Sequence, residues 1–295
     1  MSKADEARLR SRPIRLKAPV DLASAQNKTI HQDLFSVLPL LPASSADLIF
    51  VDPPYNLTKS FGSTSFRARS HDAYVEWLES WLPALLRTAK PDATVYLCGD
   101  WRSSAALYEV ASKYLIVRNR ITWEREKGRG AAGNWKNASE DIFFCTLSDR
   151  YTFNVGAVKM RRRVLAPYRT KDGAPKDWQE TGQGNMRDTF PSNIWTDLTV
   201  PFWSMRENTE HPAQKPEKLL AKLILASTNA GDLVLDPFLG SGTTSVVAKK
   251  LGRRWIGVEQ ELPFCLLAER RLELADEDPT IQGYEDAVFW ERNSR

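Results

Sequence analysis

Four consecutive residues, Asp52-Pro53-Pro54-Tyr55, combine a carboxylate, a stiff backbone and an aromatic ring. The prolines restrict φ and lack a backbone N–H, so this turn offers acceptors with few competing donors. The Asp52 carboxylate and the Pro53 carbonyl suit both hydrogens of an –NH2 group on a planar base, and Tyr55 supplies a flat face. Such hydrogen bonds would localise the amine lone pair and favour nucleophilic attack. For these four residues alone, an ordinary turn after a strand is an equal alternative.

The residues before this motif predict its place at a sheet edge. Leu48–Val51 is a short apolar run that proline soon ends, a pattern typical of a buried strand. Ligands of open α/β sheets bind beyond the carboxyl ends of the strands. We therefore expect the motif to face a ligand there.

A second pattern far downstream predicts a nucleoside site. The apolar run ending in Asp236 is followed by Gly240-Ser241-Gly242 and then by a predicted helix. The next predicted strand, Trp255–Glu259, ends in an acid roughly 20 residues beyond the glycines, a spacing typical of an acceptor for ribose hydroxyls. The turn lacks the Gly-Lys-Thr of a phosphate loop, so a nucleoside without a polyphosphate fits better than ATP.

Together these motifs resemble the DNA amino-methyltransferases, in the permuted class that places the catalytic motif before the cofactor motif. Asp52–Tyr55 matches the catalytic motif and Asp236–Gly242 matches the S-adenosylmethionine loop. His211–Pro216 matches the segment leading into the helix before that loop. The resemblance extends from about Asp33 to about Ala275.

The resemblance implies an α/β fold with a doubly wound, mostly parallel, Rossmann-like sheet of seven strands, one of them antiparallel. It also implies a circular permutation and an inserted DNA target-recognition region. The expected segments are a flexible basic arm or an edge extension (1–28), the catalytic half of the methyltransferase domain (29–153), the target-recognition region (154–210), the cofactor-binding half of the same domain (211–275) and an acidic tail (276–295).

Site roles follow from the same resemblance. The catalytic residues are Asp52, Pro53, Pro54 and Tyr55. S-adenosylmethionine is expected to contact Asp33, Lys215, Asp236, Phe238, Gly240, Ser241, Gly242, Thr243, Thr244 and Glu259. Asp33 is equally a candidate N-cap for residues 34–38, and both roles are compatible. His211 is more often a structural residue than a ligand.

The distribution of charge predicts a surface for a polyanion. The formal net charge is +4, but residues 118–187 carry +7 and the remainder carries −3. A basic middle indicates a nucleic-acid footprint, with a solvated basic loop as the alternative. Loop 56–70 is expected to be a lid that orders on DNA, or an ordinary surface loop. The candidate DNA contacts are Arg67, Arg69, Lys127, Arg129, Arg161, Arg162, Arg163 and Arg169.

The expected activity is methyl transfer from S-adenosylmethionine to the exocyclic amine of a flipped-out adenine, in a restriction-modification system. The family position of Asp52 favours adenine over the cytosine amine. A non-catalytic DNA-binding subunit of the same fold is the alternative from another class. The expected partners are double-stranded DNA, a second copy in a homodimer and a cognate restriction endonuclease.

Bulk features exclude other classes. No apolar run approaches the roughly 20 residues of a membrane helix, and the amino terminus lacks a signal-peptide core, so we expect a cytoplasmic protein without membrane contact. Cys98, Cys145 and Cys265 are widely spaced and form no metal pattern, so no metal site is expected. None follows a proline, so the Pro-Cys nucleophile of cytosine-ring methylation is absent.

Overall fold

The structure, a computed structural model, describes residues 2–125, 132–164, 168–182 and 184–292. The helices in this part are α1 (Lys3–Leu9), α2 (Leu22–Ala25), α3 (Leu34–Val37), α4 (His71–Glu79), α5 (Leu82–Leu86), α6 (Ser104–Tyr114), α7 (Glu217–Ser227), α8 (Thr243–Lys250) and α9 (Leu262–Glu277), with 3-10 turns η1 (Leu38–Leu40) and η2 (Val155–Val158). None of these helices has the length and apolar character to cross a membrane.

The strands in the same part are β1 (Lys28–His31), β2 (Ala46–Val51), β3 (Lys59–Phe61), β4 (Thr64–Phe66), β5 (Ala89–Gly99), β6 (Ile116–Glu124), β7 (Ser139–Thr146), β8 (Met160–Arg163), β9 (Gln179–Thr181), β10 (Gly184–Thr189), β11 (Ile194–Trp195), β12 (Leu233–Asp236), β13 (Arg254–Glu259), β14 (Tyr284–Glu285) and β15 (Val288–Trp290).

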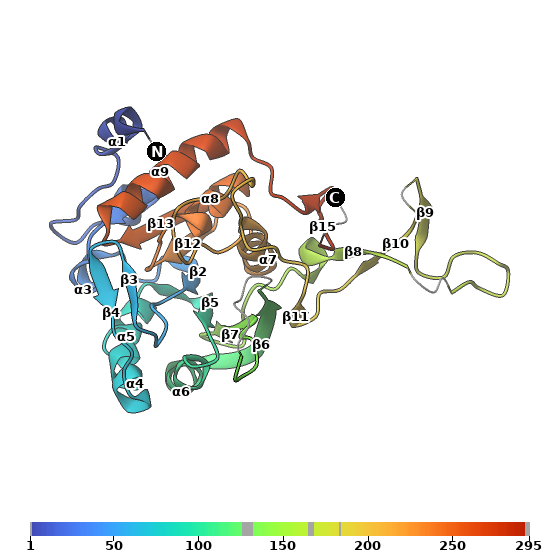
Figure 1. Ribbon diagram of the computed structural model, residues 1–295, viewed down its shortest axis with the longest axis horizontal. Helices are drawn as coiled ribbons and strands as arrows, with labels where there is room; N and C mark the ends of the chain where they lie inside the picture. Colours follow the sequence, from blue (N-terminus) through green and yellow to red (C-terminus); the bar gives the residue numbers. More distant parts are fainter. Residues whose placement is uncertain (1, 126–131, 165–167, 183, 293–295) are drawn as a thin grey trace.

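One large sheet organises the chain, with the strand order β1-β13-β12-β2-β5-β7-β6-β11 (Figure 1). Its neighbouring strands are parallel except where β7 runs antiparallel to β5 and β6, so one strand is antiparallel as predicted. The described residues form eight strands in this sheet rather than the predicted seven. The additional strand is β11, whose two residues pair with Thr122 and Trp123 at the edge of β6.

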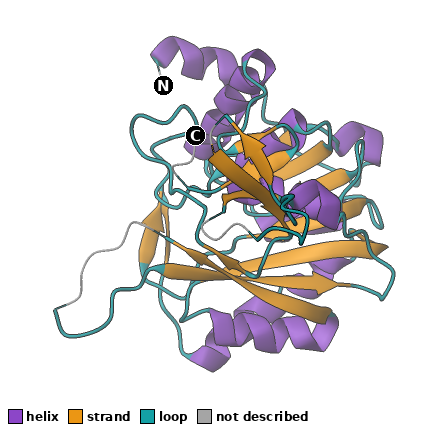
Figure 2. Cartoon of the chain, turned by 90° about the vertical axis from the view of Figure 1, so that its right-hand side faces the viewer, coloured by secondary structure: helices purple, strands orange, loops and turns teal. Residues whose placement is uncertain are grey.

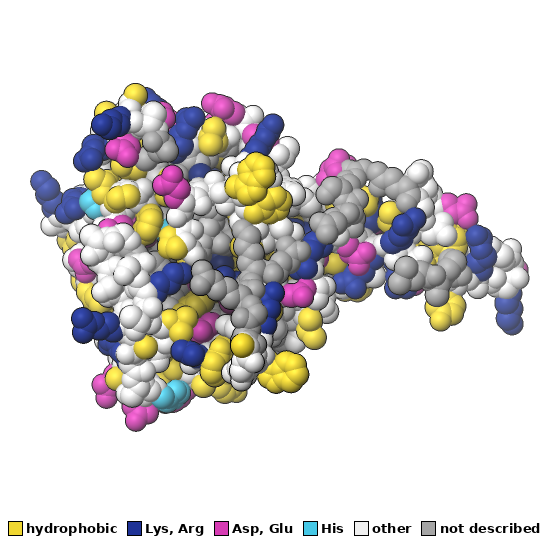
Figure 3. Space-filling model, in the orientation of Figure 1, with side chains coloured by type: hydrophobic (Ala, Val, Ile, Leu, Met, Phe, Trp, Pro, Cys, Tyr) yellow, Lys and Arg dark blue, Asp and Glu magenta, His cyan; other side chains and the backbone are white. Residues whose placement is uncertain are grey.

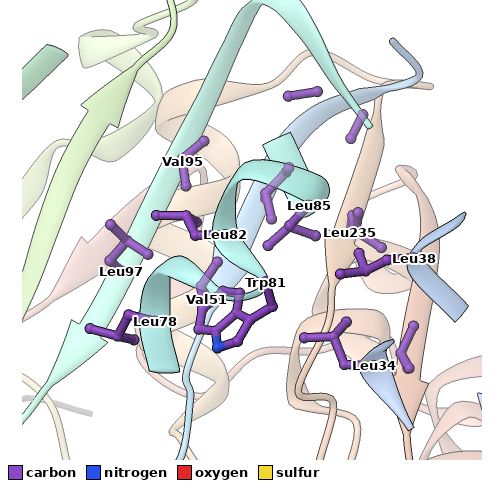
Figure 4. Packing of buried hydrophobic residues seen from close by; sticks show 14 of the residues in the cluster. Leu34, Leu38, Val51, Leu78, Trp81, Leu82, Leu85, Val95, Leu97 and Leu235 are labelled. Atoms are coloured by element: carbon purple, nitrogen blue, oxygen red, sulfur yellow. The ribbon is translucent and has the colours of Figure 1, made fainter. Parts of the chain in front are cut away.

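Apolar cores cover both faces of this sheet because side chains alternate along its strands. Ile49 and Val51 of β2 enter the core beneath α4, α5 and α6, whereas Leu48 and Phe50 enter the core beneath α7 and α8. Helices accordingly lie on both sides of the strands (Figure 2). In the first core the buried ring of Trp81 lies beside Val51 (Figure 4). The doubly wound arrangement is therefore present.

Residues 2–28 lie against the domain, so the flexible arm is not observed and the alternative, an edge extension, fits better. Leu9 of α1 is fully buried. The guanidinium groups of Arg8 and Arg12 both pair with Glu273 on α9. Ile14 forms a parallel bridge with Ile30 of β1. The basic composition of this segment did not predict these contacts, because they depend on one apolar side chain, Leu9, and on one distant acid, Glu273.

Residues 276–292 of the predicted acidic tail also belong to the folded part. It contributes β14 and β15 to a second sheet, in the order β14-β15-β8-β10-β9. Its boundary at 276 falls inside α9, which continues to Glu277. Phe289 of β15 is fully buried and aligns with Met160 of β8. This second sheet extends away from the main one (Figure 1), so β15 joins the main core to the predicted target-recognition region.

The burial of Phe289 generates a stability prediction. Phe289→Ala should lower the free energy of unfolding by about 3–5 kcal/mol, because a large core side chain is removed. The matched control is Phe190→Ala, since that ring is 66% exposed and Lys159 lies over it. It should cost less than about 1 kcal/mol. Urea unfolding of both variants measures the difference; equal costs would show that the tail does not stabilise the core.

Candidate active site

The carboxyl edge of the main sheet opens into a cavity of about 600 Å³. Its wall comes from both halves of the chain: Asp52 follows β2, Glu259 ends β13, and Phe238 lies in the turn after β12. Residues from both halves come together here because β2 lies beside β12, and neighbouring parallel strands end at the same edge of the sheet. The cavity therefore lies where the sequence places its ligand.

All four residues of the predicted catalytic motif line this cavity. The Lys215 ammonium donates to Asp52 Oδ2 at 2.6 Å, and the Tyr55 hydroxyl lies 3.0 Å from Asp52 Oδ1. The same hydroxyl lies 2.9 Å from Glu140 Oε2, so its single hydrogen serves one of two carboxylates at a time. The turn itself is held by Tyr74, whose hydroxyl donates to the Pro54 carbonyl at 2.9 Å.

The charges of this cluster are set by burial and pairing. Burial, reinforced by Asp52 and Glu140, raises the pKa of Tyr55 well above its usual value, so the phenol is a neutral donor. Burial alone would lower the pKa of Lys215, but the Asp52 and Glu140 charges outweigh it and hold this pKa above its usual value. Lys215 is therefore a buried ammonium ion. A buried charge of this kind is tolerated only with close partners.

The glycine turn after β12 is shaped by its own contacts. Asp236 accepts the backbone N–H of Phe238 at 2.9 Å and the Thr244 hydroxyl at 2.6 Å, and burial raises its pKa to about 7. Gly240 and Gly242 have φ of +55° and +82°, which favours glycine. A Cβ at Gly242 would lie 2.5 Å from that of Ala268, so close packing against α9 requires glycine there.

The predicted cofactor residues divide into two groups. Those that line the cavity are Asp33, Lys215, Phe238, Gly240 and Glu259. Those that lie behind its wall are Asp236, Ser241, Gly242, Thr243 and Thr244. Thr243 illustrates the second group, since its hydroxyl donates to the Lys215 carbonyl at 3.1 Å and accepts from Arg271. The second group therefore supports the turn and the segment that carries Lys215.

Two acids face the cavity from its outer strands. Asp33 caps α3 by accepting the Ser36 N–H at 3.1 Å, as predicted, and it also lines the cavity. Glu259 accepts the N–H groups of Gly240 and Glu261 at 2.9 and 2.8 Å. Burial raises the pKa of Glu259 to about 7. Each carboxylate oxygen keeps a lone pair for a further donor.

His211 takes a structural position beside the glycine turn. Burial lowers its pKa to about 3, so the ring is neutral near pH 7. The ring packs edge-on against Phe264 with centroids 4.4 Å apart, and its Nδ1 accepts the Ala213 N–H at 3.3 Å. His211 therefore lines the cavity as a neutral side chain.

The predicted lid loop contains the hairpin β3–β4, which is held to Glu261, close to the Glu259 end of the cavity. The Ser63 backbone N–H and hydroxyl both donate to the Glu261 carboxylate, at 3.1 and 2.9 Å. Thr64, Ser65 and Phe66 line the cavity. This latch lies two residues beyond Glu259, so the hairpin covers the acid-lined end of the cavity.

The candidate DNA contacts lie in different environments. Lys127 and Arg129 fall outside the described residues. Arg67 and Arg163 are exposed, and the Arg69 guanidinium lies 5.1 Å from the Phe66 ring centre.

The remaining candidates are in ion pairs. Arg161 makes two hydrogen bonds to Asp188, at 2.7 and 2.8 Å. Arg162 is 3.7 Å from Glu291, and Arg169 is 3.0 Å from Glu180. Lysine and arginine side chains are spread along the projecting second sheet (Figure 3).

Sequence reasoning missed Glu140, Arg125 and Lys59, which all line the cavity. Glu140 is 4% exposed, and its Oε1 is 2.6 Å from Arg125 Nη1. The sequence feature that could have indicated Glu140 is its position just before the apolar run of β7. Because β7 is antiparallel, its first residues lie at the edge where β5 ends.

Comparisons with known proteins agree with this geometry. A family model described as DNA methylase, of the N6_N4_Mtase family, matches residues 46–270. The chain therefore belongs to the N6_N4 DNA methylase family. It is 33% identical over 264 residues to DNA adenine methyltransferase YhdJ of Escherichia coli (strain K12), covering 87% of this chain and 86% of the relative. It is 32% identical over 249 residues to type II methyltransferase M.HpaI of Haemophilus parainfluenzae, covering 83% and 74%.

Solved structures of low identity share the fold. The M1.HpyAVI–SAM complex matches with a TM-score of 0.53 at 23% identity, over 83% of this chain and 98% of that chain. PvuII DNA methyltransferase (cytosine-N4-specific) matches with a TM-score of 0.59 at 17% identity, over 85% and 92%.

The hairpin latch generates a prediction at Gly62. Its φ is +61°, and a Cβ there would lie 2.6 Å from Glu261 Oε2. Gly62→Ala should destabilise the closed hairpin relative to the open one by about 1–2 kcal/mol, because alanine is strained at this positive φ. Exchange of the Ser63 amide hydrogen should then quicken by roughly 5- to 30-fold. Gly156→Ala is the control, since nothing lies within 4 Å of its Cβ position. Equal exchange in both variants would argue against the latch.

Proposed function

We propose that this chain is a site-specific DNA methyltransferase that transfers a methyl group from S-adenosylmethionine to the exocyclic amine of adenine. The observation that carries the proposal is the shared cavity, which joins Asp52–Tyr55 to the turn at Gly240 and to Glu259. Membership of the N6_N4 DNA methylase family supports the reaction class. The catalytic motif precedes the cofactor turn in the chain, which supports the permuted class.

The cavity residues fit S-adenosylmethionine by the chemistry of their donors and acceptors. Asp33 and Glu259 offer carboxylate oxygens that suit an adenine amine and ribose hydroxyls, and Phe238 offers an apolar surface. A volume of about 600 Å³ lies within the usual range for such ligands. When bound, this cofactor supplies an electrophilic methyl carbon on a sulfonium ion. We assign Asp33, Phe238, Gly240 and Glu259 to its adenosine part.

The chain's own residues then position the amine. A paired base is held inside the duplex, so the target must leave the stack to reach Asp52. Tyr55 stacks on it, a contact worth about 1–3 kcal/mol. The Asp52 carboxylate and Pro53 carbonyl accept the two amine hydrogens. With S-adenosylmethionine bound, the oriented nitrogen would form an N–C bond to the methyl carbon that the cofactor supplies, and the electron pair of the broken S–C bond would stay on sulfur. The methylated nitrogen would then pass one proton to the Asp52 carboxylate, which it contacts, and from there to water. Positioning supplies most of the rate.

Adenine is the preferred base for two reasons. Asp at position 52 resembles the adenine-specific members of the family. The relative YhdJ is named as a DNA adenine methyltransferase. The cytosine amine is the second candidate, since the fold neighbour from PvuII is named cytosine-N4-specific. Both amines carry two hydrogens for Asp52 and the Pro53 carbonyl to accept.

Partners follow from the named relatives and the projecting sheet. Type II methyltransferases such as M.HpaI support a role beside a restriction endonuclease, and a homodimer is a further proposal. We assign DNA recognition to residues 154–210, which include β8, β9 and β10. Their exposed arginines would contact phosphates or base edges of double-stranded DNA.

The assignment of Asp52 is tested by Asp52→Asn. The amide leaves the turn in place but removes the charged acceptor, so single-turnover transfer of labelled methyl groups to DNA should fall by roughly 100-fold or more. Cofactor affinity, measured by calorimetry, should change by less than about tenfold, since a single hydrogen bond near the cofactor is at stake. Digestion of the wild-type product to nucleosides should place the label in N6-methyladenine. Near-normal transfer by the variant would refute this role for Asp52.

The ribose role of Glu259 predicts a pH-dependent affinity. With a pKa of about 7 in the free protein, its carboxylate is present above pH 7 and is lost as the pH falls through 7. Cofactor affinity should therefore weaken on acidification, by at most about tenfold per pH unit. Glu259→Gln should bind roughly 10- to 150-fold more weakly at pH 8 and show a flat profile.

The control for this titration is Glu207→Gln. Burial likewise raises the pKa of Glu207 to about 7, but its side chain lies outside the cavity wall. That variant should keep the wild-type pH dependence. A wild-type profile in Glu259→Gln would assign the dependence to another group.

A further inference from the structure

Glu140 occupies a position that the mechanism above does not use. Its carboxylate is almost fully buried at the start of β7. One oxygen pairs with Arg125 at 2.6 Å, and the other lies 2.9 Å from the Tyr55 hydroxyl and 3.5 Å from the Lys215 ammonium. It therefore contacts each neighbour of Asp52 in this cluster without contacting Asp52 itself.

Lys215 stands where the target amine is expected. Its ammonium is 2.6 Å from Asp52 Oδ2 and 5.2 Å from the centre of the Tyr55 ring. These are the carboxylate and the aromatic face that the proposed function assigns to the base. The Tyr55 hydroxyl shares its one hydrogen between Asp52 Oδ1 and Glu140 Oε2, so Lys215 is the charged donor that stays on Asp52. An incoming amine must compete with the ammonium of Lys215.

A buried ammonium can leave one carboxylate only if another receives it, because an unpaired buried charge is strongly destabilising. Glu140 Oε2 meets this need. A movement of about 0.5–1 Å would bring Lys215 Nζ from 3.5 Å to ordinary hydrogen-bond distance. The ion pairs join two carboxylates, Asp52 and Glu140, to two cations, Lys215 and Arg125, and a move of Lys215 between the carboxylates leaves the net charge unchanged.

We propose that Glu140 is a positioning residue that receives Lys215 from Asp52 when the target amine enters. This inference rests on the proposed function, because it takes Asp52 as the acceptor of that amine. Glu140 acts through Lys215 and Tyr55 and does not touch the reacting atoms. Its role is to free Asp52 Oδ2 without leaving the lysine unpaired.

A purely structural role for Glu140 makes a different prediction. As an anchor for Arg125 it would stabilise the end of β6, and its loss would lower stability and activity together, whatever residue stands at 215. In a displacement role, the harm comes from a lysine that stays on Asp52. Removing that lysine should then restore transfer. The two roles are therefore separable by a double substitution.

The experiment compares Glu140→Gln, Lys215→Met and the double variant in the full chain, with the wild type as reference. Single-turnover methyl transfer to DNA reports the chemical step, and calorimetry with S-adenosylmethionine reports cofactor affinity. Glu140→Gln should slow transfer by roughly 10- to 100-fold, since one charged hydrogen bond must be broken without replacement, and should leave cofactor affinity within about threefold.

The double variant is the decisive arm. It keeps one carboxylate, Asp52, and one cation, Arg125, so the charge balance is preserved. At saturating S-adenosylmethionine, which offsets any loss of cofactor affinity from removing Lys215, transfer should recover to within about tenfold of the wild type, since the competing donor is gone. Lys215→Met alone leaves Asp52 and Glu140 facing one cation, and it should be slower than the double variant. Recovery in the double variant is an outcome that a structural role would not produce.

Glu217→Gln controls for the loss of a buried ion pair. Glu217 is buried with Arg271 and Lys250 outside the cavity wall, so this variant should lose stability without a slower chemical step. Wild-type transfer in Glu140→Gln, or a double variant no faster than Glu140→Gln, would overturn the inference and leave the proposed function standing. Absence of transfer to any DNA amine by the wild type would instead refute the proposed function.

Discussion

The pairing of β2 with β12 at the centre of the sheet is the constraint on which the site depends. These strands come from opposite halves of the chain and align Leu48 with Val234. Because they are parallel neighbours, Asp52 and the turn after Asp236 emerge at one edge. The buried pair between Lys215 and Asp52 adds a second link across the same boundary. Neither link depends on which half comes first in the chain, so a permuted motif order is compatible with one intact sheet.

The local sequence was sufficient to predict those parts of this sheet edge whose structure depends on neighbouring residues alone. The apolar run Leu48–Val51 is confirmed within β2, since buried parallel strands read as continuous apolar segments. Gly240 and Gly242 have the positive φ that a glycine turn allows. Long-range pairing is not encoded in this way. Glu140 looks like any acid at the start of a strand, and the antiparallel pairing of β7 with β5 is what brings it to the cavity.

The average composition of a segment was a poor guide to its structure where a few buried contacts hold it to the domain. The basic amino-terminal segment was predicted to be a flexible arm or an edge extension, and the last segment was predicted only as an acidic tail, yet Leu9 and Phe289 are fully buried. Conformational freedom is lost for every ordered residue, so a polar segment stays ordered only with such anchors. The anchors lie on α9 and β8, far away in the chain. A window of sequence cannot contain both partners of these contacts.

Ion pairs between basic and acidic side chains differ in strength between the buried cavity and the exposed projecting sheet. Exposed pairs such as Arg169–Glu180 are worth little, about 0–1 kcal/mol, so a DNA phosphate can replace the carboxylate at small cost. The pair between Lys215 and Asp52 is buried, so its ammonium cannot simply move to water. Arginines on the extension therefore remain available to a polyanion despite their partners, whereas the cavity needs a second carboxylate before its lysine can yield. Burial, more than the kind of ion pair, decides which contacts can exchange during recognition and catalysis.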